Sequence, residues 1–361
     1  MQRHWLQSEQ GVKGRGAASA LPHRFESTKR EPEDDGWPRD DDALQVHTAT
    51  TVEAIGAGRI LTRNASPDIP FELSINPYRG CEHGCIYCYA RPTHSYLNLS
   101  PGLDFETRLF AKMDAPAALR AALASPRYQP RSLCVGSATD AYQPVERRLR
   151  ITRGLLEVLA EARHPFLLIT KSSAVERDLD LLGALGSLAS VQITLTTLDP
   201  ELARRLEPRA TAPARRLQSI RRLAQAGVRV GVSVSPTIPF VTEPELERIL
   251  AAACDAGARQ AFTIPLRLPW EVAPLFEDWL RRHLPERAER VMARLRDLRG
   301  GKLNDARFGS RFQGEGVWAE LLRQRFRKAC ARLGLQVRAV EPDFSQFRRP
   351  VLDAPAQGSL F

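Results

Sequence analysis

Between residues 71 and 265 the chain alternates short apolar runs with longer amphipathic stretches, and this alternation limits the possible folds more than any other feature. Parallel strands need crossover connections of about a dozen residues, so this alternation predicts an α/β protein with helices covering a parallel sheet. The pattern leaves open whether the sheet closes toward a barrel or stays open and doubly wound. Either form places function at the C-terminal ends of the strands. The predicted strands are 71–75, 131–135, 166–170, 191–196, 228–234 and 260–265, and the predicted helices are 115–123, 146–162, 175–185, 200–225 and 243–256.

The regions outside this α/β body differ from it in composition. Residues 1–45 contain acidic blocks, Gly, Ser and Pro without apolar periodicity, which predicts a disordered leader. Residues 46–270 form the body, and 271–345 predict a helical extension, with its clearest helices at 286–299 and 317–333. We expect 346–361 to be a flexible tail.

The positive charge of the protein lies near its C-terminal end. From Arg281 to Arg349 the chain has 18 lysines and arginines against 8 acidic residues, which accounts for the whole net charge of +10. Such an excess favours a polyanionic partner, most simply a nucleic acid. The alternative is a solvated helical surface with no partner.

Aromatic residues stand beside many of these arginines. Their rings can stack on exposed bases while the guanidinium groups bind phosphates, which suits single-stranded or flipped-out nucleotides. The alternative is that the aromatics form the core of a helical cap on the α/β body. The residues concerned are Arg307-Phe308, Arg311-Phe312, Trp318, Arg325-Phe326 and the segment 344–349.

The composition excludes several classes of protein. With 43% hydrophobic and 26% charged residues the chain has an ordinary globular composition. No stretch approaches the roughly 18 consecutive apolar residues of a membrane span, and the first residues are not a signal peptide. We therefore predict a cytoplasmic protein without a membrane partner.

Three of the six cysteines lie in one loop after the first predicted strand. Cys81, Cys85 and Cys88 have the spacing C-x3-C-x2-C, and thiolates so spaced can converge on one soft metal centre. A tetrahedral zinc would require a fourth ligand, for which His83 is the nearby candidate. A [4Fe–4S] cluster would take the three thiolates and leave one iron open. Cys134, Cys254 and Cys330 are scattered and predict core residues.

The cysteine loop, with Tyr87 directly before the third cysteine, resembles that of the radical S-adenosylmethionine (SAM) superfamily. The resemblance implies a partial (β/α)6 barrel with the helical, Arg-rich extension appended. It implies that Cys81, Cys85 and Cys88 ligate a [4Fe–4S] cluster whose open iron is chelated by SAM. A one-electron donor such as a flavodoxin or ferredoxin then triggers cleavage of SAM to methionine and a 5′-deoxyadenosyl radical, which abstracts hydrogen from the substrate.

Within the superfamily the chain is most similar to spore photoproduct lyase and its relatives, often labelled DNA repair photolyases. Tyr87 and Tyr89 resemble the lyase's paired tyrosines, which implies a catalytic role for both in hydrogen-atom relay. The alternative for both is aromatic packing around the cluster and the adenine of SAM. The resemblance also implies that residues at the ends of the second, third and fourth predicted strands bind SAM. These candidates are Gly136, Ser137, Thr139, Asp140 and Lys171, with Thr194 and Thr196 on the fourth strand as weaker ones. For Asp140, a turn with a capping aspartate is the alternative.

Ser137 departs from the lyase pattern. The lyase has a cysteine there that donates the hydrogen completing repair, and a serine O–H is too strong a bond for that step. The resemblance therefore implies radical generation, with lesion repair or modification of a nucleic-acid base as the leading hypothesis. The alternatives are a radical SAM enzyme acting on a protein or small molecule, and a non-catalytic Cys3His zinc protein that binds nucleic acid.

The last five residues, Gln357 to Phe361, read Gln-Gly-Ser-Leu-Phe. They resemble the short peptide with which bacterial replication and repair proteins bind the DNA sliding clamp. A clamp is therefore a possible partner, although a tail that packs on its own domain is the alternative.

Overall fold

The computed structural model describes residues 12–26, 49–337 and 341–352. Its main sheet has the strand order β10-β9-β8-β7-β6-β3-β2. From β3 to β10 the strands are parallel and follow one another in chain order, and only β2 is antiparallel. A doubly wound sheet would reverse this order, so the sheet is a partial barrel. The strands are β2 (Thr62–Arg63), β3 (Leu73–Ile75), β6 (Leu133–Val135), β7 (Phe166–Thr170), β8 (Ala189–Thr194), β9 (Arg229–Thr237) and β10 (Gln260–Pro265).

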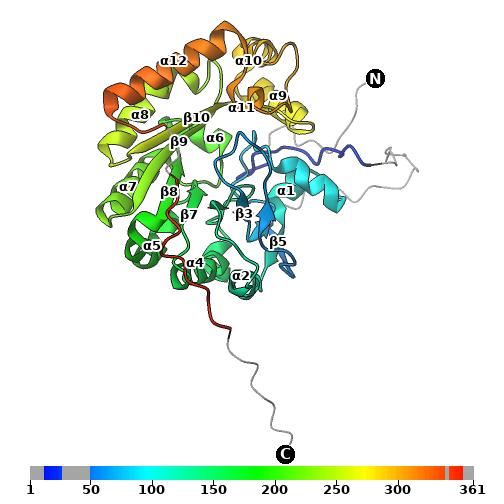
Figure 1. The fold of residues 1–361 in the computed structure, drawn as a ribbon. Helices are drawn as coiled ribbons and strands as arrows, with labels where there is room; N and C mark the ends of the chain where they lie inside the picture. Colours follow the sequence, from blue (N-terminus) through cyan, green and yellow to red (C-terminus); the bar gives the residue numbers. More distant parts are fainter. Residues whose placement is uncertain (1–11, 27–48, 338–340, 353–361) are drawn as a thin grey trace, which may run out of the picture.

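Helices surround the outer face of this curved sheet (Figure 1). Their apolar sides and the outward-facing strand residues form one continuous core, which includes Leu119, Leu155, Val191 and Ile249. The helices follow the strands in turn, as crossover connections require. They are α2 (Ala115–Ala124), α3 (Glu146–Leu149), α4 (Ile151–Glu161), α5 (Leu179–Leu185), α6 (Pro200–Leu206), α7 (Pro213–Gln225) and α8 (Leu246–Asp255), with 3-10 turns at Ser173–Asp178, Gly186–Leu188 and Glu243–Glu245.

Two of the predicted helices are each interrupted, so the single spans 146–162 and 200–225 are wrong. The first breaks at Arg150, which has the left-handed φ of 52°. The second breaks between α6 and α7, where Glu207 turns inward to a buried arginine and Pro213 begins a new helix. The apolar period continues through the break at Arg150, so the sequence does not reveal that one, whereas Pro208 and Pro213 mark the second break and should have divided the predicted helix.

The C-terminal region is helical as predicted and covers the barrel in two places. Helices α9 (Val272–His283) and α10 (Pro285–Asp297) share a core with the cysteine loop, including Ile86 and Tyr87. Helix α12 (Gly316–Leu333) packs on α8 and adds Leu322 and Phe326 to the barrel core. The short helix α11 (Ser310–Gln313) lies between them. Boundaries between domains stay predictions.

Part of the predicted leader is ordered. Residues 12–26 cross the cysteine loop, where the backbone N–H groups of Gly16 and Ala17 both donate to Glu106 at 2.9 Å. Further along, Arg24 forms an ion pair with Glu271 at 2.9 Å. Ordering this segment costs conformational entropy, and these contacts offset that cost. The composition of the leader did not reveal them. The rest of the leader lies outside the described residues.

The segment 344–349 binds the opposite end of the barrel from the cysteine loop. Phe344 and Phe347 pack edge-on against His164, which lies just before β7, and Arg349 donates to the carbonyl of Tyr128 at 3.0 Å. These aromatics therefore pack on the body instead of facing the cysteines. The predicted clamp peptide Gln357 to Phe361 lies outside the described residues. No helix in the described ranges is long and apolar enough to cross a membrane.

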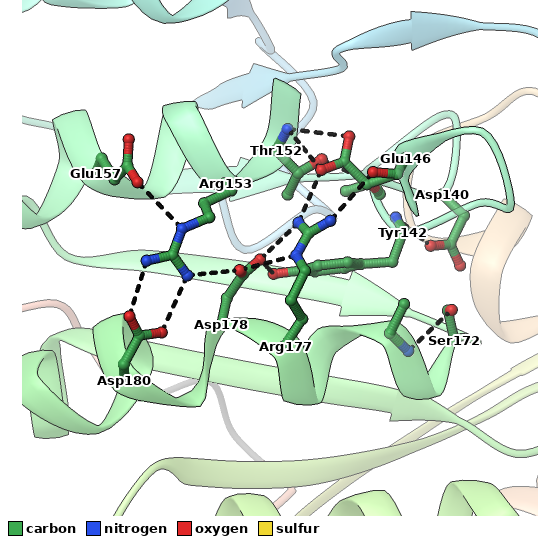
Figure 2. A network of polar contacts seen from close by, with 12 residues as sticks. Asp140, Tyr142, Glu146, Thr152, Arg153, Glu157, Ser172, Arg177, Asp178 and Asp180 are labelled. Carbon is green, nitrogen blue, oxygen red and sulfur yellow. Dashed lines mark hydrogen bonds and ion pairs between the residues drawn. The ribbon is translucent and has the colours of Figure 1, made fainter. Parts of the chain in front are cut away.

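A buried polar network fixes the loops at the C-terminal ends of β6 and β7 (Figure 2). Asp178 is fully buried and accepts hydrogen bonds from the Tyr142 hydroxyl at 2.8 Å, from Arg153 at 3.0 Å and from Arg177 at 2.9 Å. Arg177 also donates to the buried Glu146 at 2.9 Å. The loop after β6 and the turn after β7 are thereby joined before any ligand binds.

We predict that Asp178→Ala destabilises the fold by about 3 kcal/mol, because it leaves Tyr142 and two arginines without their shared acceptor. The matched control is Asp180→Ala, which removes an exposed carboxylate from the same Arg153 and should cost less than about 1 kcal/mol. Urea unfolding of both variants measures the difference. Equal losses would contradict the role given to Asp178.

Candidate active site

The cysteine loop opens onto a cavity of about 770 Å³ inside the barrel. Residues from five strand ends line its walls, which is where a parallel barrel collects functional side chains. The cavity brings together most of the predicted site residues: Cys81, Cys85, Cys88, Tyr89, Gly136, Ser137, Thr139, Asp140, Lys171 and Thr194. Tyr87 is absent from the lining.

The loop backbone is folded tightly at two glycines. Gly80 and Gly84 precede the first two cysteines and have φ values of 78° and 66°, which side chains disfavour. A Cβ at Gly84 would lie 2.6 Å from the Glu106 carboxylate, so there is also no space for one. Strand β4 (Tyr78–Arg79) leads into the loop, pairing with β5 (Arg108–Lys112), which in turn pairs with β1 (Thr51–Ile55).

A fully buried ion pair between Arg91 and Glu106 holds the loop from behind. Arg91 donates to the carbonyl oxygens of Cys85 at 2.9 Å and Gly84 at 3.1 Å, and also to the chain at residues 101 and 102. A buried charge is costly unless it is paired and hydrogen-bonded, and here both conditions are met. The ion pair thus fixes the direction of the cysteine backbone.

The three thiols fit a shared soft centre. Burial raises the pKa of Cys85 to about 12, and burial followed by the neighbouring Asp140 and the other two cysteines raises the pKa of Cys81. A thiolate-binding group would offset these costs, because it replaces the thiol protons. Within the described ranges no three His, Cys, Asp or Glu side chains are arranged to hold a single metal ion, whereas a [4Fe–4S] cluster takes each thiolate on a different iron. His83 points to Asp140, with Nδ1 3.3 Å from Oδ2.

Asn76, directly after β3, organises the turn that holds the next candidates. Its side-chain oxygen accepts from the N–H groups of Ala138 at 2.8 Å and Thr139 at 3.3 Å, and its amide donates to the Ser137 hydroxyl at 3.2 Å. The Thr139 hydroxyl donates to the Tyr78 carbonyl at 3.1 Å. Gly136 has a φ of 82°, and a Cβ there would meet a β7 carbonyl at 2.9 Å.

The Asp140 carboxylate is used by the chain itself. It accepts from Tyr142 N at 2.8 Å, Thr170 Oγ1 at 2.7 Å and Lys171 N at 2.7 Å. Burial opposes its ionisation, but His83 and these donors outweigh burial and lower its pKa. The capping turn weighed from the sequence is therefore present, and Asp140 positions Lys171. A direct contact with SAM stays a prediction.

Lys171 presents a free ammonium group to the cavity. No hydrogen bond or ion pair joins it to another residue within 12–26, 49–337 or 341–352, and its Nζ lies 6.0 Å from the ring centre of Tyr87. Burial opposes its charge, yet Cys85 and Glu207 reverse that effect and raise its pKa. A partly buried cation without a bound carboxylate is costly, so a carboxylate ligand here would stabilise the site.

The two predicted catalytic tyrosines differ in placement. The Tyr87 hydroxyl donates to the buried Glu207, which also accepts from Thr196 at 2.8 Å and pairs with Arg216. Tyr87 thus faces a structural network outside the cavity lining. Tyr89 lines the cavity, is 49% exposed and donates to the Ser137 carbonyl.

Several of these supporting residues escaped the sequence analysis. Arg91, Glu106 and Glu207 lie in polar segments that look like ordinary surface, and only tertiary contacts bury them. Asn76 did carry a signal, since a polar residue immediately after a buried strand is placed at the functional edge. Of the scattered cysteines, Cys134 and Cys330 are buried as predicted, while Cys254 is partly exposed.

Comparison with known proteins identifies the family. Residues 75–253 match the family described as the Radical SAM superfamily. An uncharacterized protein of Mycobacterium tuberculosis is 35% identical over 234 residues, which cover 64% of this chain and 68% of that one. The chain belongs to the radical SAM superfamily. An uncharacterized protein of Methanocaldococcus jannaschii is 27% identical to this radical SAM protein over 47% of the chain and 62% of its own length.

Solved structures of spore photoproduct lyase share the fold. A mutant lyase with bound AdoMet and dinucleoside spore photoproduct superposes with a TM-score of 0.56 at 16% identity, covering 79% of this chain and 80% of that one. The lyase complexed with dinucleoside spore photoproduct gives 0.55 at 17% identity, covering 79% and 81%. The partial barrel with its helical C-terminal region is thus confirmed, and the superfamily implies SAM and a [4Fe–4S] cluster as cofactors.

We predict that Arg91→Lys destabilises the protein by about 2 kcal/mol and lowers the iron it retains after reconstitution. Lysine keeps the charge but lacks the planar fork that reaches several carbonyls at once. Arg120→Lys is the matched control, because Arg120 pairs with Glu161 on the surface. Unfolding and iron analysis test both; retained iron equal to wild type in Arg91→Lys would contradict the role of the ion pair.

We predict that Lys171→Ala weakens SAM binding at least about tenfold while iron content stays unchanged, because the ammonium is free for a carboxylate. Lys302→Ala removes the same charge from an exposed position and should bind SAM normally. Equilibrium binding of SAM to the reconstituted proteins measures both. Wild-type affinity in Lys171→Ala would remove this residue from the cofactor site.

Proposed function

We propose that this radical SAM enzyme abstracts hydrogen from a base in nucleic acid, in lesion repair or base modification. When bound, the cluster and SAM supply a carbon radical that takes a hydrogen atom. The chain's own residues do the rest: Cys81, Cys85 and Cys88 would hold the cluster, and Lys171 would orient the SAM carboxylate. Gly136, Ser137, Thr139, Asp140 and Thr194 would shape the remainder of that site.

The wall of the cavity carries the observation behind the nucleic-acid substrate. Aromatic rings and guanidinium groups alternate there: Tyr89, then Arg267, then Phe312, with Arg311 against Phe312. Such surfaces suit bases that have left a stack, since a ring can stack on any base and arginine binds phosphate. Phe308, which is 60% exposed and lies just before α11, extends this surface, because the Arg311 guanidinium lies over its ring.

The basic extension supports this proposal less than its charge alone indicated. Arg325 forms ion pairs with Glu243 and with Glu247, the latter at 2.8 Å. Arg307 forms one with Asp305 at 2.8 Å. Phe326 packs in the barrel core. The helical-cap alternative therefore describes much of α12, and we assign nucleic-acid contact to the α11 side.

Hydrogen return to the substrate differs from the lyase scheme in this proposal. The Ser137 hydroxyl accepts from Asn76, and its O–H bond is too strong to donate a hydrogen atom. Cys134 is fully buried within β6 and does not line the cavity. Repair by the lyase's route would need a donor from elsewhere, which base modification does not require.

Anaerobic reconstitution with iron and sulfide, followed by reduction in the presence of SAM, tests the proposal. We expect a brown protein that forms 5′-deoxyadenosine, with stimulation by a single-stranded oligonucleotide. Cys85→Ala should abolish formation, and Cys254→Ala is the matched control that should not. The one-electron donor is proposed to be a flavodoxin or ferredoxin, which the assay can compare with a chemical reductant.

Other outcomes separate the alternatives. A colourless zinc protein without nucleoside formation would favour the Cys3His binding protein. Cleavage of SAM with no oligonucleotide binding at any salt concentration would favour a protein or small-molecule substrate, because phosphate contacts must weaken as salt rises. The sliding clamp and a cytoplasmic location stay predictions.

A further inference from the structure

Arg267 is an unsatisfied cation at the wall of the cavity. It follows β10, and its guanidinium carbon lies over two aromatic rings, 5.3 Å from the centre of Tyr89 and 5.2 Å from that of Phe312. No residue in the described part of the chain accepts a hydrogen bond from its guanidinium or forms an ion pair with it. Its direct contacts are with ring faces, and the carboxylate that acts on its charge from beyond ion-pair distance, Asp68, is already paired with Arg311.

The guanidinium N–H donors of Arg267 are without acceptors in the described part of the chain. The guanidinium carbon lies over the two rings, while its five N–H donors, which lie in the plane of the group, have no hydrogen-bond acceptor among the described residues. In-plane donors of this kind bind phosphate or carboxylate oxygens in pairs. The ring of Tyr89 is itself fixed, because its hydroxyl donates to the Ser137 carbonyl. The site is therefore arranged before a ligand arrives.

Two other arginines lie near Arg267, and one of them is paired with a carboxylate while the other, within the described ranges, is not. Arg311, on the other side of Phe312, is neutralised by Asp68 at 2.6 Å and 2.8 Å. Arg299 lies behind, 4% exposed, with one guanidinium bond to the Pro265 carbonyl at 3.3 Å and two nitrogens without partners. Burial, then repulsion from Arg267, lowers the pKa of Arg299 to about 10. An anion at Arg267 would relieve this excess of positive charge.

Arg267 lies close to the cysteine loop. Tyr89 directly follows Cys88, so a single aromatic side chain separates Arg267 from the cysteine loop. The same cavity contains Lys171, Cys88 and Arg267 in its lining. A group anchored at Arg267 would place the atoms attached to it within the cavity.

We propose that Arg267 is the phosphate-binding residue of the substrate site, where it holds the phosphate next to the nucleoside that enters the cavity. This inference rests on the proposed function for its nucleic-acid source; the phosphate chemistry itself rests on the free guanidinium. A small phosphorylated substrate would present the same group.

The test compares the reconstituted full-length protein with Arg267→Gln in binding a fluorescent twelve-residue oligothymidylate. We expect the variant to bind at least about tenfold more weakly. The slope of log affinity against log salt should fall by about one, as for loss of a single phosphate contact. Arg221→Gln removes an equal charge from the exposed face of α7 and should change neither quantity comparably. Arg267→Lys should restore part of the affinity.

A neutral methylphosphonate introduced into the oligonucleotide, one linkage at a time, identifies the contact. We expect one position to weaken binding to wild type and to have no further effect on Arg267→Gln. Full sensitivity of the variant at every position would overturn the proposal. SAM affinity, measured in parallel, should be unchanged; an equal loss would assign Arg267 to the cofactor and overturn it as well.

Failure of the proposed function has a different outcome from failure of this inference. Wild-type protein that binds oligonucleotide no better than Arg267→Gln does would overturn the inference alone. Wild-type protein that binds no oligonucleotide but binds inorganic pyrophosphate through Arg267 would overturn the nucleic-acid function and support the phosphate site. Binding of neither probe would overturn both.

Discussion

The buried pair of Arg91 and Glu106 is the interaction on which the rest of the site depends. Arg91 holds the carbonyls of Gly84 and Cys85, while Glu106 accepts from the N–H groups of Gly16 and Ala17. Neither charged side chain is exposed to solvent. Because water cannot stabilise these charges, the loss of any hydrogen-bond partner would be costly. One ion pair thereby joins the cysteine loop to a segment from the start of the chain.

This arrangement explains why distant parts of the chain converge on the loop. Residues 12–26 cover it on one side, and α9 and α10 share an apolar core with it on another. A loop of cysteines has little apolar surface of its own, so its order must come from neighbours. The segments that looked like appendages are therefore part of the structure that positions the thiols.

The charges around the cavity follow a consistent pattern. The carboxylates near it are already bound: Asp140 by backbone and hydroxyl donors, and Glu207 by Arg216. Two cations that line it, Lys171 and Arg267, have no acidic partner in the described ranges. A cavity with satisfied anions and unsatisfied cations is suited to ligands that carry anionic groups, such as the carboxylate of SAM or the phosphate of the proposed substrate.

The sequence by itself determined the parallel α/β fold, the six strands and the three cysteines, because apolar period and ligand spacing are local properties. It also located Lys171, since a charge directly after a buried strand must lie at the strand's C-terminal end. The sequence analysis missed the break at Arg150, where the apolar period continues, and the break after α6, although Pro208 and Pro213 mark that one. Only the tertiary structure decided that Tyr87 faces Glu207 while Tyr89 faces the cavity, and that Arg325 is neutralised while Arg267 is free. Those differences depend on which distant side chains meet, and no spacing along the chain encodes such a meeting.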